Sequence, residues 1–322
     1  MFFTRLWAAS MLFGAVFASL VQAQEYPVKP VRVMIPWPPG GSNDIVGRVV
    51  AQKLSENLRQ QFVIDNRGGA SGTIGAEIFA KTDPDGYSMM IHSATHVANP
   101  HLYRKLPYDT LNDFIGVTTL ARQVGILAVH PALPVKSLKE FIALARSRPS
   151  QIVYASSGSG SYVHLLMAMV NSMTGTKMVH VPYKGGGPAV ISIVSGETQA
   201  IFATIGSLLT QLKSGRVRPL AVSSDTRVKQ FPDVPTVAEA GIPGYEFTAW
   251  VGAFLPAKTP ASIVNKLNAE LQKTLTDPGV AEKLSAQTLD PMAMTPQQFS
   301  ARLKSDYDKY GRLIKETGAK LD

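Results

Sequence analysis

The sequence contains no cysteine among its 322 residues. A disulfide framework is therefore excluded, and the stability of the folded chain must come from apolar cores. With 45% hydrophobic residues, burying such cores presents no difficulty. If residues 1–23 are removed as argued below, the remaining 299 residues are enough for two domains.

Runs of basic residues interleaved with aromatics are also missing. The net charge is +9 and the isoelectric point is about 9.6, but the basic residues come singly or in pairs such as Arg146/Arg148 and Arg216/Arg218. This pattern, together with the export signal described next, argues against nucleic-acid binding. A positive surface instead draws small anions towards the protein.

After the N-terminus no apolar run approaches the ~18 residues that span a bilayer. Residues 1–23 themselves have the composition of a secretory signal peptide, with Arg5 at the start, an apolar run over 6–20 and a small-residue cleavage site ending at Ala23. A retained membrane anchor is the alternative, but the apolar run is short and is broken by Ser10, Gly14 and Ser19. Cleavage and export are predicted, and the net charge then falls to +8 because Arg5 is lost.

Several catalytic and metal-binding motifs are absent or incomplete. The phosphate loop GxxxxGK[ST] and the nucleophile elbow GxSxG do not occur, and Val163 replaces the third glycine of a dinucleotide fingerprint. Ser161 with His164 could form a nucleophile–base pair, but nothing in the sequence supplies a third, activating group. His92 and His96 are four residues apart without an acidic partner, so no metal site and no cofactor are predicted.

What the sequence does contain is a repeated strand–glycine loop–helix unit. Residues 31–35 read as a buried strand, the prolines and Gly40/Gly41 end it, and Ser42, Asn43 and Asp44 are good N-cap candidates for an amphipathic helix. Such loops leave backbone amides free at the carboxyl end of a strand, where open α/β sheets bind anions and other ligands.

Similar units recur in two blocks, residues 31–91 and 152–202. The alternation predicts mostly parallel sheets flanked by helices. A long strand over 246–255 and two helices over 263–275 and 299–314 suggest that the chain returns to the first block. We therefore expect an α/β fold of two lobes joined by two crossing strands, which is the architecture of a hinge-closing binding protein. The expected lobes are residues 24–122 with 250–322, and residues 123–249.

The whole mature length resembles the Bug-type solute-binding receptors of tripartite tricarboxylate transporters. Eight motifs in chain order carry this resemblance: Pro36-x-x-Pro39-Gly40-Gly41-x-x-Asp44, Asp65-Asn66-Arg67, Pro84-Asp85-Gly86-Tyr87, Asn99-Pro100-x-Leu102-Tyr103, Leu106-Pro107-Tyr108-Asp109, Tyr154-Ala155-Ser156-x-Gly158-x-Gly160-Ser161-x-x-His164, His180-Val181-Pro182-Tyr183-Lys184-Gly185 and Pro232-Asp233-Val234-Pro235-Thr236-x-x-Glu239-Ala240-Gly241.

The resemblance implies a periplasmic receptor of the Venus flytrap type, and we expect it to be a monomer. Such a receptor captures a small organic carboxylate between its lobes and delivers it to the permease subunits in the membrane. Carried over by position, the predicted ligand-binding residues are Trp37, Ser42, Asn43, Asp44, Ala70, Ser71, Gly72, Thr73, Ser93, Thr95, Ser156, Ser157, Ser161, His164, Tyr183, Lys184, Gly185, Ala203 and Thr204.

One position departs from the family pattern. Many members carry an aspartate where this chain has Ala203, and an acidic group there could pair with a ligand ammonium. We therefore expect a di- or tricarboxylate or an aromatic acid rather than an amino acid. Two other functions stay open: an exported hydrolase that uses Ser161 and His164, and a ligand-loaded partner of a membrane histidine kinase.

Overall fold

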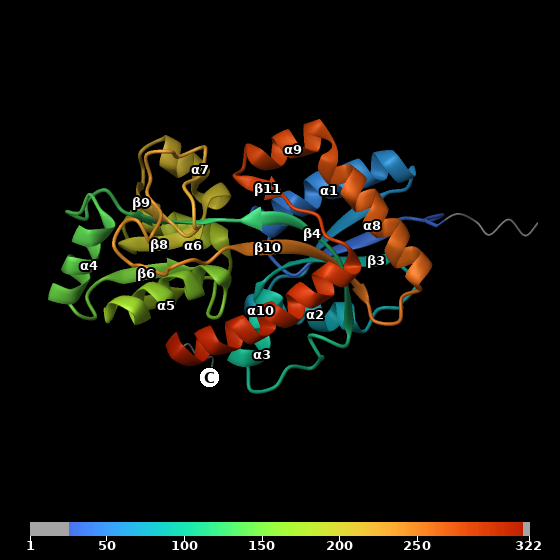
Figure 1. Cartoon of the computed structure of the whole chain (residues 1–322), viewed down its shortest axis with the longest axis horizontal. Coiled ribbons are helices and arrows are strands. Elements are labelled where there is room, and N and C mark those ends of the chain that lie inside the picture. The colour runs from blue at the N-terminus through green and yellow to red at the C-terminus, as the bar shows by residue number, and fades with distance from the viewer. Residues whose placement is uncertain (1–25, 318–322) are drawn as a thin grey trace, which may run out of the picture.

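The structure, a computed structural model, describes residues 26–317 and has two lobes side by side (Figure 1). The predicted signal peptide, residues 1–23, lies outside the described residues. Each lobe is built around one sheet with helices on both faces, so the predicted α/β class with two lobes is confirmed. Within residues 26–317 no helix is long and apolar enough to cross a membrane.

The first lobe contains a six-stranded sheet with the order β11-β4-β10-β3-β1-β2. β1 pairs in parallel with β2 and β3, whereas β10 is antiparallel to β3 and β4, and β11 is antiparallel to β4. The strands are β1 (Val31–Ile35), β2 (Phe62–Asn66), β3 (Ser88–Ser93), β4 (Phe114–Gln123), β10 (Ala249–Pro256) and β11 (Leu289–Pro291).

The second lobe contains a five-stranded sheet with the order β7-β6-β8-β5-β9. β6 pairs in parallel with β7 and β8, and β5 is antiparallel to β8 and β9. The strands are β5 (Gly125–Val129), β6 (Val153–Ser156), β7 (Val179–Pro182), β8 (Ala200–Thr204) and β9 (Arg218–Val222).

Helices cover both faces of each sheet because successive strand residues point to opposite sides and both sides are buried. On the first sheet α1, α8 and α9 cover one face, and α2, α3 and α10 the other; on the second, α4 and α5 lie opposite α6 and α7. The helices are α1 (Ser42–Leu58), the 3₁₀ turn η1 (Ala70–Gly72), α2 (Thr73–Ala80), α3 (Thr95–Leu102), α4 (Leu138–Ser147), α5 (Tyr162–Thr174), α6 (Gly186–Ser195), α7 (Ile205–Lys213), α8 (Ala261–Thr276), α9 (Pro278–Ser285) and α10 (Pro296–Thr317).

Two segments cross between the lobes (Figure 1). β4 ends at Gln123 in the first sheet and β5 begins at Gly125 in the second; the return passes through Phe247, which donates its amide to Ser223 O at 2.9 Å, before β10 begins at Ala249. We propose lobe boundaries at 122/123 and 249/250. The end of β4 at Gln123 and the start of β10 at Ala249 support these boundaries to within one residue.

Some local predictions were wrong. The strands of the βα units are parallel as expected, but the crossing strands add antiparallel pairs, so both sheets are mixed rather than mostly parallel. Thr95–Leu102 forms helix α3, which the sequence pattern did not indicate, and the strand expected over 246–255 begins only at Ala249. β11 and α9 were not predicted, because a three-residue strand and an eight-residue helix carry little periodic signal.

Candidate functional site

A small cavity lies between the lobes, at the carboxyl ends of the parallel strands. Its volume is about 60 Å³. Both lobes contribute to its wall, which is formed by Trp37, Pro38, Gly41, Ser42, Asn43, Ser93, Thr95, Gln123, Ser157, Ser161, Tyr162, Val163, Gly186, Ala189, Ile201, Ala203, Thr204 and Ser207. We call this space the inner cavity.

Five helices begin at the inner cavity. The first residues of α1, α3, α5 and α6 line it, as does Thr204, the N-cap residue of α7. A helix N-terminus carries unpaired amides and a partial positive charge, so it attracts anions. None of the described residues that line the inner cavity carries a charged side chain. The positive potential of this cavity therefore comes from the main chain, and hydroxyl and amide side chains supply further hydrogen-bond partners.

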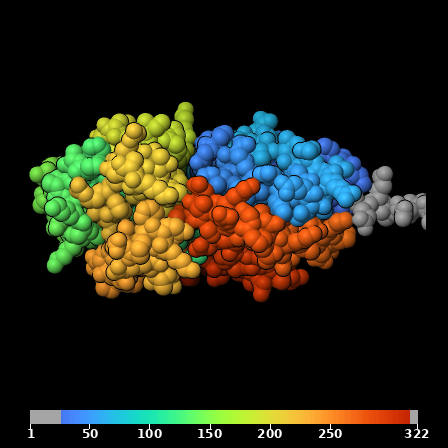
Figure 2. Space-filling view, turned by 90° about the horizontal axis from the view of Figure 1, so that it is seen from above, coloured from blue at the N-terminus to red at the C-terminus, as the bar shows by residue number. Residues whose placement is uncertain are grey.

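The lobes touch across the cavity. Ser42 Oγ donates to Thr204 Oγ1 at 2.9 Å, and the amide of Tyr162 donates to Thr95 Oγ1 at 3.3 Å. Figure 2 shows the lobes meeting along a narrow seam, with blue and red residues on one side and green to gold residues on the other. The structure is thus a closed form, in which polar groups of both lobes face the inner cavity.

A second, outer cavity of about 660 Å³ adjoins the first and shares Trp37, Pro38 and Ser157 with it. Lys184 is the only charged side chain among the described residues of its wall. Here Ser71 Oγ donates to Ser159 O of the other lobe at 2.5 Å. The other residues lining it are Pro39, Asn66, Gly68, Gly69, Ala70, Gly158, Tyr103, Tyr183 and Gly185.

The turn that carries Ser71 has an unusual backbone. Ala70 and Ser71 both have positive φ, 46° and 52°. Non-glycine residues adopt this left-handed conformation at some energetic cost, and such residues concentrate at ligand sites. The conformation places the Ser71 hydroxyl against the opposite lobe, so the strained turn forms part of the contact between the lobes.

Asp44 braces the loop after β1 and lines neither cavity. Its side chain is 4% exposed and accepts hydrogen bonds from Gly40 N at 3.0 Å, Arg48 Nε at 2.9 Å and Asn66 Nδ2 at 3.0 Å. Burial alone would raise the pKa of Asp44, but these bonds and the Arg48 charge outweigh burial and lower it below its usual value. The ionised carboxylate therefore fixes the loop that presents Ser42 to the cavity.

His164 braces the loop after β6 in a different way. Its Nδ1 accepts the amide of Gly160 at 3.0 Å, and its ring stacks on that of His180 with centroids 3.9 Å apart. His180 Nε2 in turn lies 2.6 Å from Ser156 Oγ. Burial lowers the pKa of His164 to about 4, and burial with the neighbouring His164 lowers the pKa of His180 to about 3. Both imidazoles are thus neutral at pH 7.

The same contacts bear on the hydrolase alternative. Ser161 Oγ accepts a hydrogen bond from the backbone N–H of His164 at 3.2 Å. Ser161 is therefore the N-cap residue of α5. The acceptor nitrogen of the His164 ring is occupied by Gly160. This arrangement caps a helix and supports a loop, and it does not orient a base towards the Ser161 hydroxyl as nucleophilic catalysis requires.

His92 and His96 are fully buried behind the first-lobe loops. His92 Nδ1 accepts from Ser93 N at 2.8 Å and from Trp37 Nε1 at 3.3 Å, so it supports the indole at the wall shared by the two cavities. Burial lowers the pKa of both histidines, that of His96 to about 3. In the part of the chain that the structure describes, no group of three or more His, Asp or Glu side chains is placed to hold a metal ion.

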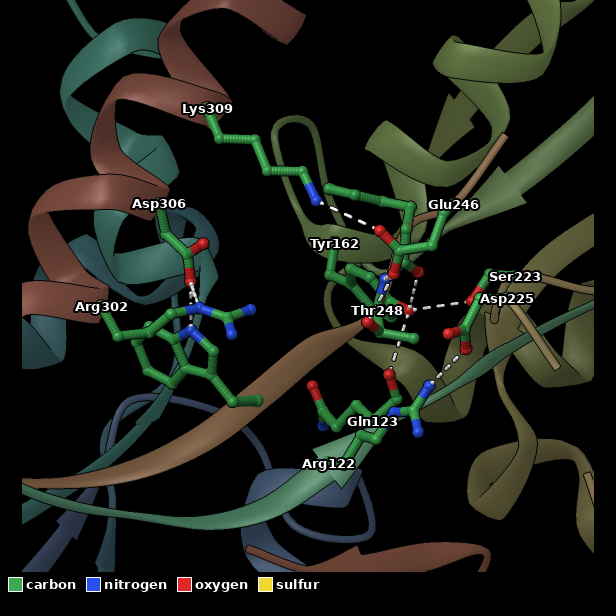
Figure 3. Close-up of polar contacts among 12 residues, drawn as sticks. Arg122, Gln123, Tyr162, Ser223, Asp225, Glu246, Thr248, Arg302, Asp306 and Lys309 are labelled. Carbon is green, nitrogen blue, oxygen red and sulfur yellow. Dashed lines mark hydrogen bonds and ion pairs between the residues drawn. The ribbon is translucent and has the colours of Figure 1, made fainter. Parts of the chain in front are cut away.

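A polar network surrounds the crossing segments (Figure 3). Arg122 pairs with Asp225 at 3.1 Å, and Lys309 pairs with Glu246 at 3.4 Å. In the same region Tyr162 Oη lies within 3.4 Å of three oxygen atoms from separate segments. Tyr162 lines the inner cavity and also contacts the crossing segments, so it links the hinge to this cavity.

The structure distributes the predicted site residues over three places. The inner cavity receives Trp37, Ser42, Asn43, Ser93, Thr95, Ser157, Ser161, Ala203 and Thr204. The outer cavity receives Trp37, Ala70, Ser71, Ser157, Tyr183, Lys184 and Gly185. Five residues line neither cavity and support the loops from behind: Asp44, Gly72, Thr73, Ser156 and His164.

Sequence reasoning missed several cavity residues, among them Gln123, Tyr162, Val163, Ala189, Ile201 and Ser207. Tyr162 directly follows Ser161, a predicted ligand-binding residue, so its position in the chain could have indicated it. Gln123 ends a crossing strand, and its place depends on the closure of the two lobes. No local pattern indicates that arrangement.

The closed cleft between two α/β lobes, with helix N-termini converging on a small cavity, defines a solute-binding protein. A family model described as "Tripartite tricarboxylate transporter family receptor" matches residues 46–319. The chain belongs to this family, whose receptors are periplasmic solute-binding proteins.

Known proteins are similar to this chain along nearly its full length. Protein BugT of Bordetella pertussis is 34% identical over 322 residues, which cover 99% of each chain. The solved structure of R. palustris Rpa4515 with adipate has a TM-score of 0.89 and 34% identity, covering 92% of this chain and all of that one. MatC from Rhodopseudomonas palustris with bound malate has a TM-score of 0.83 and 29% identity, covering 90% and 100%.

Proposed function

We propose that the protein captures a small dicarboxylate in the inner cavity and delivers it to the membrane permease of a tripartite tricarboxylate transporter. The observation that carries the proposal is the convergence of five helix N-termini on a cavity whose described lining has no charged side chain. A carboxylate there accepts charge-assisted hydrogen bonds from amides and hydroxyls, which are about twice as strong as neutral ones.

The shape and lining of the cavity favour a short aliphatic acid. Val163, Ala189, Ile201 and Ala203 give the wall apolar patches between its polar groups, which suits methylene groups. Ala203 brings no acidic group that could pair with a ligand ammonium. The adipate and malate in the two solved relatives are dicarboxylates as well. A tricarboxylate and an aromatic acid are the alternatives that the experiment below compares.

The test is a ligand screen on the chain that begins at Gln24, purified under denaturing conditions and refolded to remove bound solute. Malate, succinate, adipate, citrate, benzoate, aspartate and glutamate are titrated by calorimetry and thermal melting. A ligand at about 100 times its dissociation constant adds about 2.7 kcal/mol of stability, which raises the melting temperature by roughly 5 °C. Tighter binding of aspartate than of any plain dicarboxylate would refute the ligand class.

Delivery is tested separately in cells. Deleting the gene should abolish uptake of the radiolabelled acid that binds in vitro, and a copy in trans should restore it. Normal uptake combined with loss of a transcriptional response to the acid would favour the co-sensor function instead. Turnover of a carboxylate ester by the refolded protein, abolished by Ser161→Ala, would favour the hydrolase.

A further inference from the structure

Tyr162 connects the inner cavity to the hinge. It is the first residue of α5, its ring is 4% exposed, and it lines the inner cavity. Its backbone amide donates to Thr95 Oγ1 of the first lobe at 3.3 Å. The hydroxyl at the end of its side chain lies among the crossing segments (Figure 3).

The partners of this hydroxyl lie on both crossings. It donates to Phe247 O at 3.0 Å and lies 3.4 Å from Gln123 O and 3.3 Å from Ser223 Oγ. Gln123 is the last residue of β4, on the first crossing, and Phe247 lies two residues before β10, on the second. Ser223 joins them, since its hydroxyl accepts from Gly125 N and its carbonyl accepts from Phe247 N, both at 2.9 Å.

These contacts are specific to one arrangement of the crossing segments. A hinge opens through changes in the backbone angles of a few residues in the connecting segments. Such changes move the carbonyls of Gln123 and Phe247 relative to each other and to α5. A single buried hydroxyl that bonds within this group stabilises the closed arrangement and not the open one.

We propose that Tyr162 is a positioning residue that couples occupation of the inner cavity to closure of the hinge. Its ring and amide lie on the ligand side, and its hydroxyl holds the two crossing segments in the closed geometry. The proposal rests on the proposed function for the identity of the ligand, but the coupling of the hydroxyl to the hinge does not depend on which solute binds.

The test is Tyr162→Phe, which removes only the hydroxyl and keeps the ring at the cavity wall. Because the chain has no cysteine, Asp83→Cys in the first lobe and Lys139→Cys in the second allow specific dye labelling for single-molecule energy transfer. We expect the adipate dissociation constant to rise about five-fold, the effect of one neutral hydrogen bond. The rate at which the adipate-bound lobes reopen should rise by a similar factor.

Tyr245→Phe is the matched control. Tyr245 is also buried and its hydroxyl donates to Leu166 O at 2.9 Å, inside the second lobe. This variant should lose stability without changing adipate affinity or reopening rate. Equal reopening rates in Tyr162→Phe and the unmodified protein would overturn the proposal, including the case in which affinity alone falls, because the hydroxyl would then act on the ligand directly. If the unmodified protein binds none of malate, succinate and adipate, the proposed function fails, and the closed dwell time without ligand still tests the hinge.

Discussion

The two lobes present similar loops to the inner cavity but support them by different chemistry. In the first lobe the loop at residues 40–44 is held by the ionised Asp44, which binds Arg48, Asn66 and a loop amide. In the second lobe the loop at residues 156–161 is held by the neutral ring of His164, stacked on His180. The loop at residues 40–44 is thus supported by a charge and the loop at residues 156–161 by uncharged imidazoles.

The difference has a consequence for acid tolerance. A carboxylate with a lowered pKa keeps its hydrogen bonds until the pH falls below its usual titration range, near 4. An imidazole that is neutral in the folded chain becomes a destabilising group as soon as the pH falls below about 6.5, where the unfolded chain begins to bind protons. The loop at residues 156–161 should therefore lose its support at a higher pH than the loop at residues 40–44.

The largest effect is expected from removing the charged support, with Asp44→Asn. The new amide directs an N–H group at one of the donors Gly40, Arg48 or Asn66 and leaves a buried group without its partner. We expect the free energy of unfolding to fall by about 3 kcal/mol, measured by urea denaturation. Arg48→Gln is the control: its exposed charge should contribute less than about 1 kcal/mol. Equal losses in the two variants would show that the loop bonds of Asp44 are unimportant.

The next effect is the pH dependence of the second-lobe support. Above pH 6.5 His164 is neutral in both states, so its contribution does not change with pH. Between pH 6.5 and about 4 the unfolded chain binds a proton that the folded chain does not, so stability falls as the pH falls. At pH 5 the loss from His164 is about 2 kcal/mol.

His164→Gln tests the contribution of His164 to this loss of stability. Glutamine can still accept a hydrogen bond from the Gly160 amide, but it does not titrate. Urea denaturation of both proteins at pH 7.5 and pH 5.0 should give a smaller loss for the variant. His92 and His96 remain in both proteins and contribute equally, whereas His180 loses a neighbour that helps to lower its pKa, which further reduces the loss in the variant. A variant whose stability falls as steeply as that of the unmodified protein would exclude His164 as a source of acid sensitivity.

A smaller effect is expected where the loops of the two lobes meet. A Cβ atom on Gly185 would lie 2.5 Å from Pro38 Cγ of the other lobe, so Gly185→Ala should hinder closure. We expect at least about ten-fold weaker ligand binding, or about 1.4 kcal/mol, by calorimetry. Gly241→Ala has the same kind of positive φ, 117° against 109°, with no atom within 4 Å. It should strain the backbone without weakening binding, and equal affinities in both variants would contradict the closure contact.

The smallest effect should come from the hydroxyl bond that joins the first-lobe loop to the second lobe. Ser42→Ala removes the donor to Thr204 Oγ1, which can still donate to Ser207 Oγ at 3.0 Å. About 1 kcal/mol, or roughly five-fold in the dissociation constant, is expected. An unchanged reopening rate in Ser42→Ala would show that this bond does not contribute to closure.

The sequence predicted the fold where the signals are local. The glycine loop at 40–44 indicated a helix start at a strand end, and the structure places Ser42 and Asn43 at the inner cavity. The start of the helix was predicted to within a few residues because turn chemistry depends on neighbouring residues, but Gly41 is the N-cap residue and none of the candidates Ser42, Asn43 and Asp44 caps the helix.

Other features could not be predicted in this way. Helix α3 buries the polar His96 and Asn99 together with the apolar Val97 and Ala98, so it lacks the amphipathic pattern that indicates a helix. Asp44 and His164 were predicted to bind ligand, yet their bonds go to the loops behind the cavity. Distinguishing a supporting group from a binding group requires the direction of each side chain, which residue type and spacing do not give.

The inner cavity separates two kinds of selectivity. Under the proposed function, the preference for negative charge comes from the helix N-termini, which persist whichever side chains surround them. The shape of the accepted ligand depends on small apolar side chains such as Ala189, Ile201 and Ala203. Substitutions at these positions can therefore change which acid is bound while the preference for anions is retained. Such an arrangement lets one scaffold diversify across many carboxylates by point mutation, with no need to rebuild its electrostatics.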